Sequence, residues 1–405
     1  GVVFPTSDTN IRNESANIEA SGDIRITALN GVGELSDGYV YDPNQPLTPL
    51  TRALLAAALP GDLTTRSDGL SVLRQEDDLN IEFSNIVDDE AVGTFSVENT
   101  SSDVYLASEE AVQVAQINTN ARLELRIDGN LTNAGTAASA INAHSIQLES
   151  GVGGIGTNAM PLTLTTQAGG SLQFAAGTSA YVTSPTAAVS LVAASAGETL
   201  NLNAAGAITD FIGGTADRVF GDQIILSGAS IGTDTQTLGL RQNDTSGSVN
   251  LTSTAGDIQV AVNHVGLNLN GFQSAAGGRI LTSADAPVVF TAADSVRFAN
   301  DATLRFVSGA SVTTNATSGT DIGGGTLTID AAATWGTATT PITTSVNVLS
   351  FTSSLPANTG DNSHLYLSEE TDLLVTGLTQ SDNATSQTEI TTGGNLDVRN
   401  AVSAG

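Results

Sequence analysis

The stretch IGTNAMPLTL, residues Ile155–Leu164, occurs in the chain in three related forms. It returns as IGTDTQTLGL at Ile231–Leu240 and as WGTATTPITT at Trp335–Thr344. The shared frame is a large apolar residue, Gly-Thr, several variable positions, and then a segment that opens with Leu or Ile. Glycine permits a tight corner at positive φ, and the apolar residue before it would point inward. The frame therefore predicts a repeated corner that leads into a strand.

Short segments in which apolar and small polar residues alternate fill most of the chain. Examples are RLELRI (Arg122–Ile127), SIQLES (Ser145–Ser150) and SVNLTST (Ser248–Thr254). This period of two is typical of a strand with one buried face. A β-sandwich and a β-solenoid both produce many such strands at short intervals.

Three features favour the solenoid. Asn-Gly and Asp-Gly hairpin turns are few, the chain repeats, and aromatic residues make up only 4% of it. We expect a narrow coil to hold stacked aliphatic side chains and to leave little room for large rings. We therefore predict an all-β chain, a right-handed parallel β-helix (β-solenoid) with short loop and helical insertions.

The prediction also gives the number of turns, the length of the rod and the division of the chain into segments. At roughly 20–25 residues a turn the chain would form on the order of 16–19 turns, a rod roughly 80–90 Å long at the ~4.8 Å strand spacing. We predict solenoid turns in residues 1–35 and 99–405 and an irregular acidic insertion in residues 36–98. Within the insertion, LTPLTRALLAAALPG (Leu47–Gly61) has the capping residues of a short helix.

A second repeat has a much longer period. SDVYLASEE at Ser102–Glu110 returns as SHLYLSEE at Ser363–Glu370, which places Tyr105 and Tyr366 261 positions apart. The tripeptide GNL follows each copy, so a long unit of that size is predicted. Because no polar cap follows the second copy, we expect the chain to be a segment of a larger protein or to have its end covered by a partner.

The charge balance excludes some partners. The chain has 42 acidic and 13 basic residues, all 13 of them Arg, and a formal net charge of −29. Nucleic acids and anionic membrane surfaces both require clustered positive charge, so we expect neither as a partner. No apolar run reaches the ~18–20 residues of a membrane helix, and without Cys there are no disulfides.

The corner GVGGIGTNAMPLTL and the double strand GSVNLTSTAGDIQV (Gly247–Val260) resemble filamentous-haemagglutinin-type sequences. Those are large secreted or surface-displayed bacterial proteins built on a right-handed parallel β-helix. The resemblance covers Asn17–Asn30 and most of Ser101–Gly405. It implies an extracellular adhesin-like rod at a bacterial cell surface, acting in adhesion, matrix or surface-layer assembly. Implied partners are copies of itself, neighbouring segments of the same protein, a glycan or a cell-surface receptor.

Two acidic clusters are candidate Ca²⁺ sites, because this hard cation takes six to eight oxygen ligands. They are Glu76, Asp77 and Asp78, and Asp88, Asp89 and Glu90. No EF-hand loop occurs, and IGGGTLTID (Ile322–Asp330) is a single, imperfect copy of a glycine-rich calcium-binding nonapeptide. A solvated acidic face is the alternative interpretation of both clusters. We expect no other cofactor.

Polysaccharide lyases and hydrolases also use parallel β-helices, so a polysaccharide-active enzyme or a Ca-dependent glycan-binding module is the alternative function. Such enzymes need a base and carboxylates set close together. The nearest approach in the sequence is Asp217 beside Arg218, and Asp397 two positions before Arg399. We interpret both pairs as surface ion pairs, and therefore predict no catalytic residue and no enzymatic activity.

Overall fold

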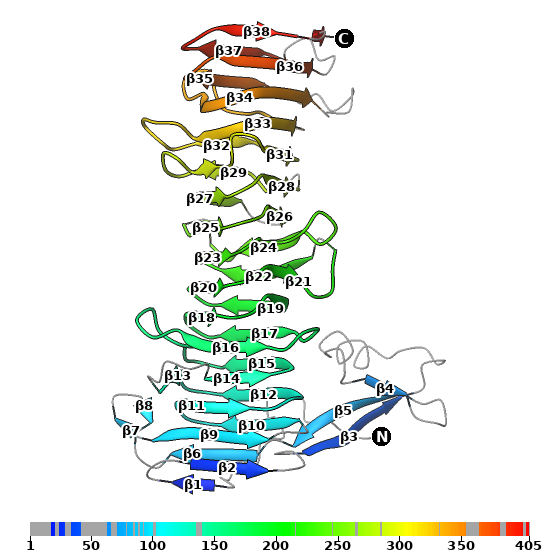
Figure 1. Cartoon of the computed structure of the whole chain (residues 1–405), viewed down its shortest axis with the longest axis vertical. Helices are drawn as coiled ribbons and strands as arrows, with labels where there is room; N and C mark the ends of the chain where they lie inside the picture. Colours follow the sequence, from blue (N-terminus) through cyan, green and yellow to red (C-terminus); the bar gives the residue numbers. More distant parts are fainter. Residues whose placement is uncertain are drawn as a thin grey trace.

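Parallel strands stacked into a β-solenoid of about 12 turns form most of the molecule (Figure 1). The computed structural model describes residues 18–20, 24–28, 34–41, 63–65, 71–77, 79–83, 86–87, 90–91, 93–99, 103–134, 140–214, 216–244, 246–263, 266–283, 286–331, 333–353, 364–380, 386–399 and 402–404. These residues contain no helix, and hence none that could cross a membrane. The helix predicted at Leu47–Gly61 lies outside them. The parallel solenoid is confirmed, whereas its right-handedness stays a prediction.

The strands follow one another at short intervals along the whole chain. The first third contains β1 (Ile18–Ala20), β2 (Ile24–Ala28), β3 (Glu34–Tyr41), β4 (Leu63–Thr65), β5 (Ser71–Asp77), β6 (Leu79–Phe83), β7 (Ile86–Val87), β8 (Glu90–Ala91), β9 (Thr94–Asn99), β10 (Val104–Ser108), β11 (Val112–Asn118), β12 (Arg122–Ile127) and β13 (Leu131–Asn133). The middle third contains β14 (Ile141–Ala143), β15 (Ser145–Ser150), β16 (Leu162–Thr166), β17 (Leu172–Ala176), β18 (Ala180–Ser184), β19 (Val189–Ala196), β20 (Thr199–Ala204), β21 (Ile208–Asp210), β22 (Asp217–Gly221), β23 (Gln223–Gly228), β24 (Leu238–Gln242), β25 (Ser248–Ser253) and β26 (Ile258–Val262). The last third contains β27 (Leu267–Ser274), β28 (Gly278–Thr282), β29 (Val288–Phe290), β30 (Val296–Arg297), β31 (Thr303–Ser308), β32 (Val312–Thr314), β33 (Ile322–Ala331), β34 (Ile342–Ser353), β35 (Leu365–Glu369), β36 (Leu373–Gln380), β37 (Thr388–Thr392), β38 (Leu396–Val398) and β39 (Val402–Ala404).

Alternation of buried and partly exposed side chains along single strands builds the core. In β16, β17 and β18 every second residue is buried, as the period-two pattern predicts. Inward residues of successive turns then stack in ladders such as Leu125, Leu148 and Phe174, which lie 23 and 26 residues apart. One apolar core therefore runs along the rod.

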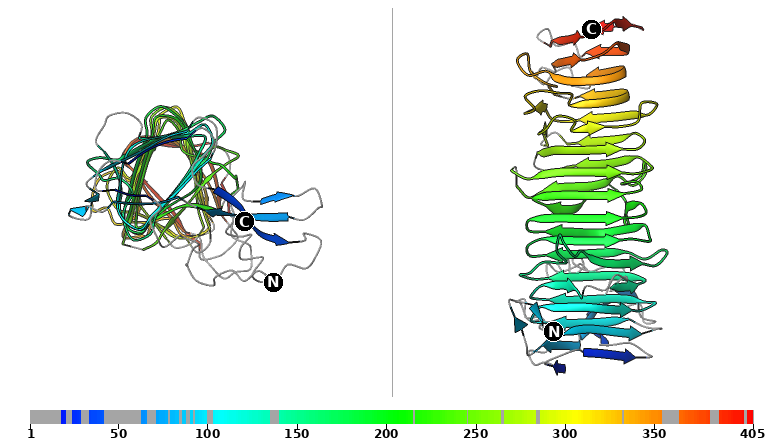
Figure 2. Two further views of the ribbon diagram at one scale, coloured as in Figure 1. Left: turned by 90° about the horizontal axis from the view of Figure 1, so that it is seen from below. Right: turned by 60° about the vertical axis from the view of Figure 1, so that its left-hand side comes forward.

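The predicted count of 16–19 turns is wrong, although the predicted length of a turn is close. Strands β3, β4 and β5 form an antiparallel sheet that projects sideways from the rod (Figure 2) and adds no turn. Strands β6 and β9, by contrast, pair in parallel with strands of the coil. The division of the chain into three segments stays a prediction.

The repeated Gly-Thr corner has one geometry in all three places. Its leading residues Ile155, Ile231 and Trp335 are fully buried, and each pairs with the turns on both sides. The glycines that follow them have φ of 64°, 65° and 67°. Each threonine hydroxyl then accepts a hydrogen bond from the backbone N–H three residues later, at 3.0, 2.9 and 2.9 Å. The corner predicted from the sequence is confirmed.

The interior holds more aromatic rings than the sequence led us to expect. The fully buried rings are Phe95, Phe174, Phe272, Phe290, Phe306, Phe351 and Trp335. They fit because rings of neighbouring turns meet edge to face: the ring of Phe306 lies 4.8 Å from that of Trp335 and 6.5 Å from that of Phe290. The expectation that the coil leaves little room for rings is wrong.

The long repeat also has a structural counterpart. Strands β35–β39 repeat β10–β14 in order and in pairing: β10 pairs with β12 as β35 does with β37, and β11 pairs with β13 and β14 as β36 does with β38 and β39. In both copies the tyrosine lies opposite a glutamate of the next turn, Tyr105 opposite Glu124 and Tyr366 opposite Glu389.

The two copies of the long unit differ in their orientation around the rod. The chain of parallel pairings that starts at β10 passes through β12, β15, β17, β19, β22, β24, β26, β28, β31, β33 and β34 and ends at β36. Strand β36 is the counterpart of β11 rather than of β10. The second copy is therefore rotated about the long axis of the rod, by one face of the coil, relative to the first copy.

Candidate functional site

Three of the six predicted Ca²⁺ ligands lie in the described residues, in two different sheets. Glu76 and Asp77 end strand β5, and Glu90 opens strand β8. Asp78, Asp88 and Asp89 lie outside the described residues. The Ca²⁺ sites therefore stay a prediction.

The imperfect calcium motif in β33 has another role. Within the described residues, no group of three or more acidic or histidine side chains is close enough to hold a metal ion. Asp330, the last residue of IGGGTLTID, accepts hydrogen bonds from Arg305 at 2.9 and 2.7 Å. The glycines of the motif make room for side chains of the preceding turn, as described below.

A buried ion network joins three turns near the start of the rod. Glu124 is fully buried and forms ion pairs with Arg122, at 2.8 Å, and with Arg126. Gln147, on the next turn, donates to Glu124 at 3.2 Å and accepts from Arg122 at 2.9 Å. The Arg122 guanidinium also lies 5.9 Å from the centre of the Tyr105 ring. Because these charges are satisfied by one another, we interpret the network as structural.

One of the two predicted surface ion pairs is wrong. Arg218 pairs with buried Asp210, whose two carboxylate oxygens each lie 3.1 Å from Nε, rather than with its neighbour Asp217. Burial favours Asp210 as the partner because solvent screens it less. The second pair is confirmed, since Arg399 lies 2.7 Å from Asp397 and both side chains are exposed.

Two further buried acids lie near the C-terminal end of the rod. Asp321 accepts hydrogen bonds from the hydroxyl of Thr314 at 2.7 Å and from the backbone N–H of Thr343 at 2.8 Å. Burial raises the pKa of Asp321, and the two hydrogen bonds only partly oppose that rise. Glu369 accepts from the hydroxyl of Thr344 at 2.8 Å. Both carboxylates hold adjacent turns together.

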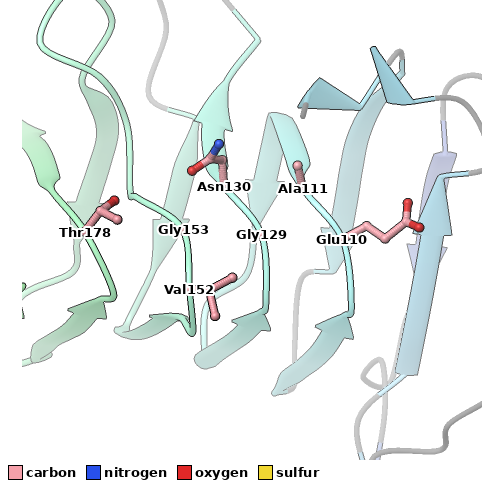
Figure 3. A pocket seen from close by; sticks show the side chains of 7 residues that line it. All are labelled: Glu110, Ala111, Gly129, Asn130, Val152, Gly153 and Thr178. Atoms are coloured by element: carbon pink, nitrogen blue, oxygen red, sulfur yellow. The ribbon is translucent and has the colours of Figure 1, made fainter. Parts of the chain in front are cut away.

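A hollow of about 420 Å³, the N-terminal groove, lies where four successive turns change direction (Figure 3). It is lined by Glu110, Ala111, Gly129, Asn130, Val152, Gly153 and Thr178. A Cβ on Gly129 would lie 2.5 Å from the backbone nitrogen of Ala111. Glycine is therefore required here, because turns only ~4.8 Å apart leave no space for a side chain that points along the rod.

Two hollows of about 400 and 540 Å³ near the other end share the residues Asn300, Gly324 and Ser345. We call their union the C-terminal trough. Its other lining residues are Arg297, Phe298, Thr320, Gly323, Asn347, Glu370, Thr371, Asp372 and Gly394. Because these residues come from successive turns, the trough runs along the rod, over roughly 19 Å for four steps of ~4.8 Å.

The two hollows occupy matching positions in the long repeat. Ala111 and Gly129 of the N-terminal groove have Asp372 and Gly394 as their counterparts in the C-terminal trough, since β11 matches β36 and β13 matches β38. The second copy is turned by one face, so the hollows lie at different corners of the coil. The rod therefore presents hollows in two directions, and the C-terminal trough has the more polar lining of the two.

One wall of the C-terminal trough is a fixed arginine. Arg297 forms an ion pair with Asp294, which is the one non-glycine residue with positive φ, 61°, among the described residues. A Cβ on Gly323 would overlap the Arg297 guanidinium, and a Cβ on Gly324 would lie 2.7 Å from the Phe298 ring. The glycines thus let both side chains lie flat against the next turn, which keeps the trough open.

Hydrogen-bonding groups line the rest of the C-terminal trough. The Thr320 hydroxyl donates to Glu370 at 2.6 Å, and the Asn347 amide donates to the backbone oxygen of Asn300 at 3.2 Å. Asp372 accepts from the backbone N–H of Asn395 at 2.6 Å. The trough offers amides, hydroxyls and carboxylates, and can bind a ligand rich in hydrogen-bonding groups.

The sequence did not indicate this trough. Its residues lie in five separate segments of the chain. Only the glycine run that begins at Gly323 forms part of a sequence pattern, the imperfect calcium motif. Comparisons of the chain with known protein families, with curated proteins and with solved structures found no match.

Proposed function

We propose that the chain is a structural and adhesive segment of a large extracellular bacterial surface protein of the filamentous-haemagglutinin type. The observation that supports this most is the stack of about 12 parallel turns around one continuous apolar core. Such a coil is a stiff rod without hinges, because the strands of every turn are hydrogen-bonded to those of the next turn. The acidic surface keeps a rod of this kind soluble outside the cell.

The proposed partners are copies of the chain, neighbouring segments of the same protein, and a glycan or receptor on a cell surface. Nucleic acid and membrane insertion are not expected, for the reason of charge given above. We also expect no enzymatic turnover, because the buried charged groups Glu124, Asp210 and Asp321 are already engaged in hydrogen bonds and ion pairs within the protein. Ca²⁺ at Glu76–Asp78 or Asp88–Glu90 remains part of the proposal.

The proposal is tested with beads that carry the purified chain through a terminal tag. Bead–bead association reports self-assembly, and retention under flow on glycan-coated or matrix-coated surfaces reports adhesion. Each is measured with and without a calcium chelator. Control beads carry a globular protein of similar size and negative charge. Equal association and equal retention for both kinds of bead would contradict an adhesive role.

A further inference from the structure

We propose that the C-terminal trough binds a linear, uncharged, hydroxyl-rich oligosaccharide. This inference names a ligand for the adhesive part of the proposed function. It rests on that part of the proposal and on no other. Three properties of the trough support it: its charge, its hydrogen-bonding groups and its shape.

The charge of the trough excludes strongly anionic ligands. Its lining contains Arg297, Glu370 and Asp372, and Arg297 is already paired with Asp294. The local balance is therefore negative, on a chain of net charge −29, and a polyanion would be repelled. A small cation is disfavoured by the guanidinium in the wall and by the lack, within the described part of the chain, of three clustered acidic ligands.

The polar groups match a ligand that both donates and accepts hydrogen bonds. A carboxylate has about four acceptor positions, so Glu370 and Asp372 retain capacity beyond the one hydrogen bond described for each. Bonds from sugar hydroxyls to these ionised groups are stronger than bonds between neutral groups. Asn347 and Ser345 lie between the two acids and the arginine wall and can both donate and accept.

The shape of the trough favours a chain-like ligand. The trough follows the rod axis across successive turns, and its two parts are continuous through Asn300, Gly324 and Ser345. A short linear saccharide can place one hydroxyl pair at each turn. A peptide would instead leave its apolar side chains against a mostly polar lining.

Isothermal titration calorimetry on the whole chain tests the proposal. The probes are four neutral hexasaccharides, namely α-1,4-glucan, β-1,4-glucan, β-1,4-mannan and N-acetylated chitin, together with hexagalacturonate as the anionic comparison and deacetylated chitohexaose as the cationic one. We expect at least one neutral probe to bind, and both charged probes to bind at least about tenfold more weakly. Tighter binding of either charged probe, or no binding of any neutral probe, would overturn the proposal.

Three variants locate the site. Glu370→Gln should weaken binding at least about tenfold, as expected for the loss of charge-assisted hydrogen bonds, and Asn347→Ala should weaken it several-fold. Asp234→Asn changes an exposed acid that does not line the trough and should leave the affinity unchanged. Denaturant unfolding checks that all three variants are folded. Unchanged affinity in both trough variants would place the binding elsewhere.

The bead assay distinguishes ligand binding in the C-terminal trough from the more general proposal that the chain is adhesive. Beads that carry Glu370→Gln should lose retention on the neutral glycan and keep bead–bead association. If they are retained like the unmodified chain, the trough is not the site although adhesion stands.

Discussion

At the scale of single residues, glycines set the spacing of the coil. The corner glycines Gly156, Gly232 and Gly336 combine a left-handed backbone with close contact to the next turn. A side chain there would require both an unfavourable φ and a displaced neighbour. Gly169 has a similar φ of 79°, but a Cβ on it would have no atom within 4 Å. A comparison of the two kinds of glycine therefore separates the cost of the left-handed backbone conformation from the cost of close packing against the next turn.

We expect Gly169→Ala to lower the free energy of unfolding by about 1–2 kcal/mol, the cost of a left-handed non-glycine residue. Gly232→Ala should cost at least about 1 kcal/mol more, because its Cβ would overlap the backbone oxygen of Gln259 and force one turn away from the next. Urea unfolding of both variants measures the difference. Equal losses would show that packing at the corner contributes nothing.

Asp321 should give the rod a pH-dependent stability. Its folded-state pKa is raised by burial, so the protonated form is favoured in the folded chain. The stabilisation is complete below the unfolded-state pKa of about 3.9, and it is lost as the pH rises through the folded-state value. Asp321→Asn keeps a neutral side chain at every pH. The stability of the variant relative to the unmodified chain should therefore increase as the pH rises from about 4 towards neutrality.

Chemical denaturation of both proteins at several pH values in that range tests this expectation. The comparison between the two removes the contribution of the many other acids. A difference in unfolding free energy that stays constant with pH would show that Asp321 has the same pKa in both states.

At the scale of strands and turns, charges have different roles according to their burial. The Glu124 carboxylate is fully buried, and the two arginines that neutralise it are mostly buried. The Arg305–Asp330 pair joins neighbouring turns, and its arginine is 55% exposed. The ion pairs of Glu124 lie within strand β12 and reach the next turn through Gln147, so the two cases compare a buried acid with an exposed pair.

Glu124→Gln should lower the free energy of unfolding by about 2–4 kcal/mol, because it leaves two partly buried guanidinium groups without their counter-charge. Asp330→Asn should cost less than about 1 kcal/mol, since water already screens that pair. Thermal and urea unfolding measure both. A loss for Glu124→Gln as small as that for Asp330→Asn would mean that water enters the network freely.

Sequence patterns predicted strands and corners well and side-chain partners poorly. Alternation identified strands such as Arg122–Ile127, and the Gly-Thr frame identified all three corners, because both depend on neighbours along the chain. The partner of Arg218 and the C-terminal trough depend on residues brought together from different turns. Their sequence separations vary with turn length, which ranges from 23 to 26 residues even between Leu125 and Phe174. Residue spacing alone therefore could not locate them.

At the scale of the whole molecule, the rod differs from a globular core in how far a local change spreads. Each turn contacts mainly the turns directly below and above it, so stability is close to a sum of neighbouring interfaces. The long repeat agrees with this local organisation, because β35–β39 reproduce β10–β14 although the intervening turns separate the two copies (Figure 1). Local damage should therefore open the rod locally.

Phe306→Ala provides the test, because Phe306 is fully buried between the rings of Phe290 and Trp335. Removing the ring should cost about 3–5 kcal/mol at that level of the rod. Hydrogen–deuterium exchange followed by mass spectrometry should then show faster amide exchange in β28–β34 and unchanged protection in β14–β20. The two regions are joined only through intermediate turns, so protection in β14–β20 reports whether the effect has travelled. A uniform rise in exchange along the chain would show that the turns unfold as one cooperative unit, and the rod could not then be described as a stack of neighbouring interfaces.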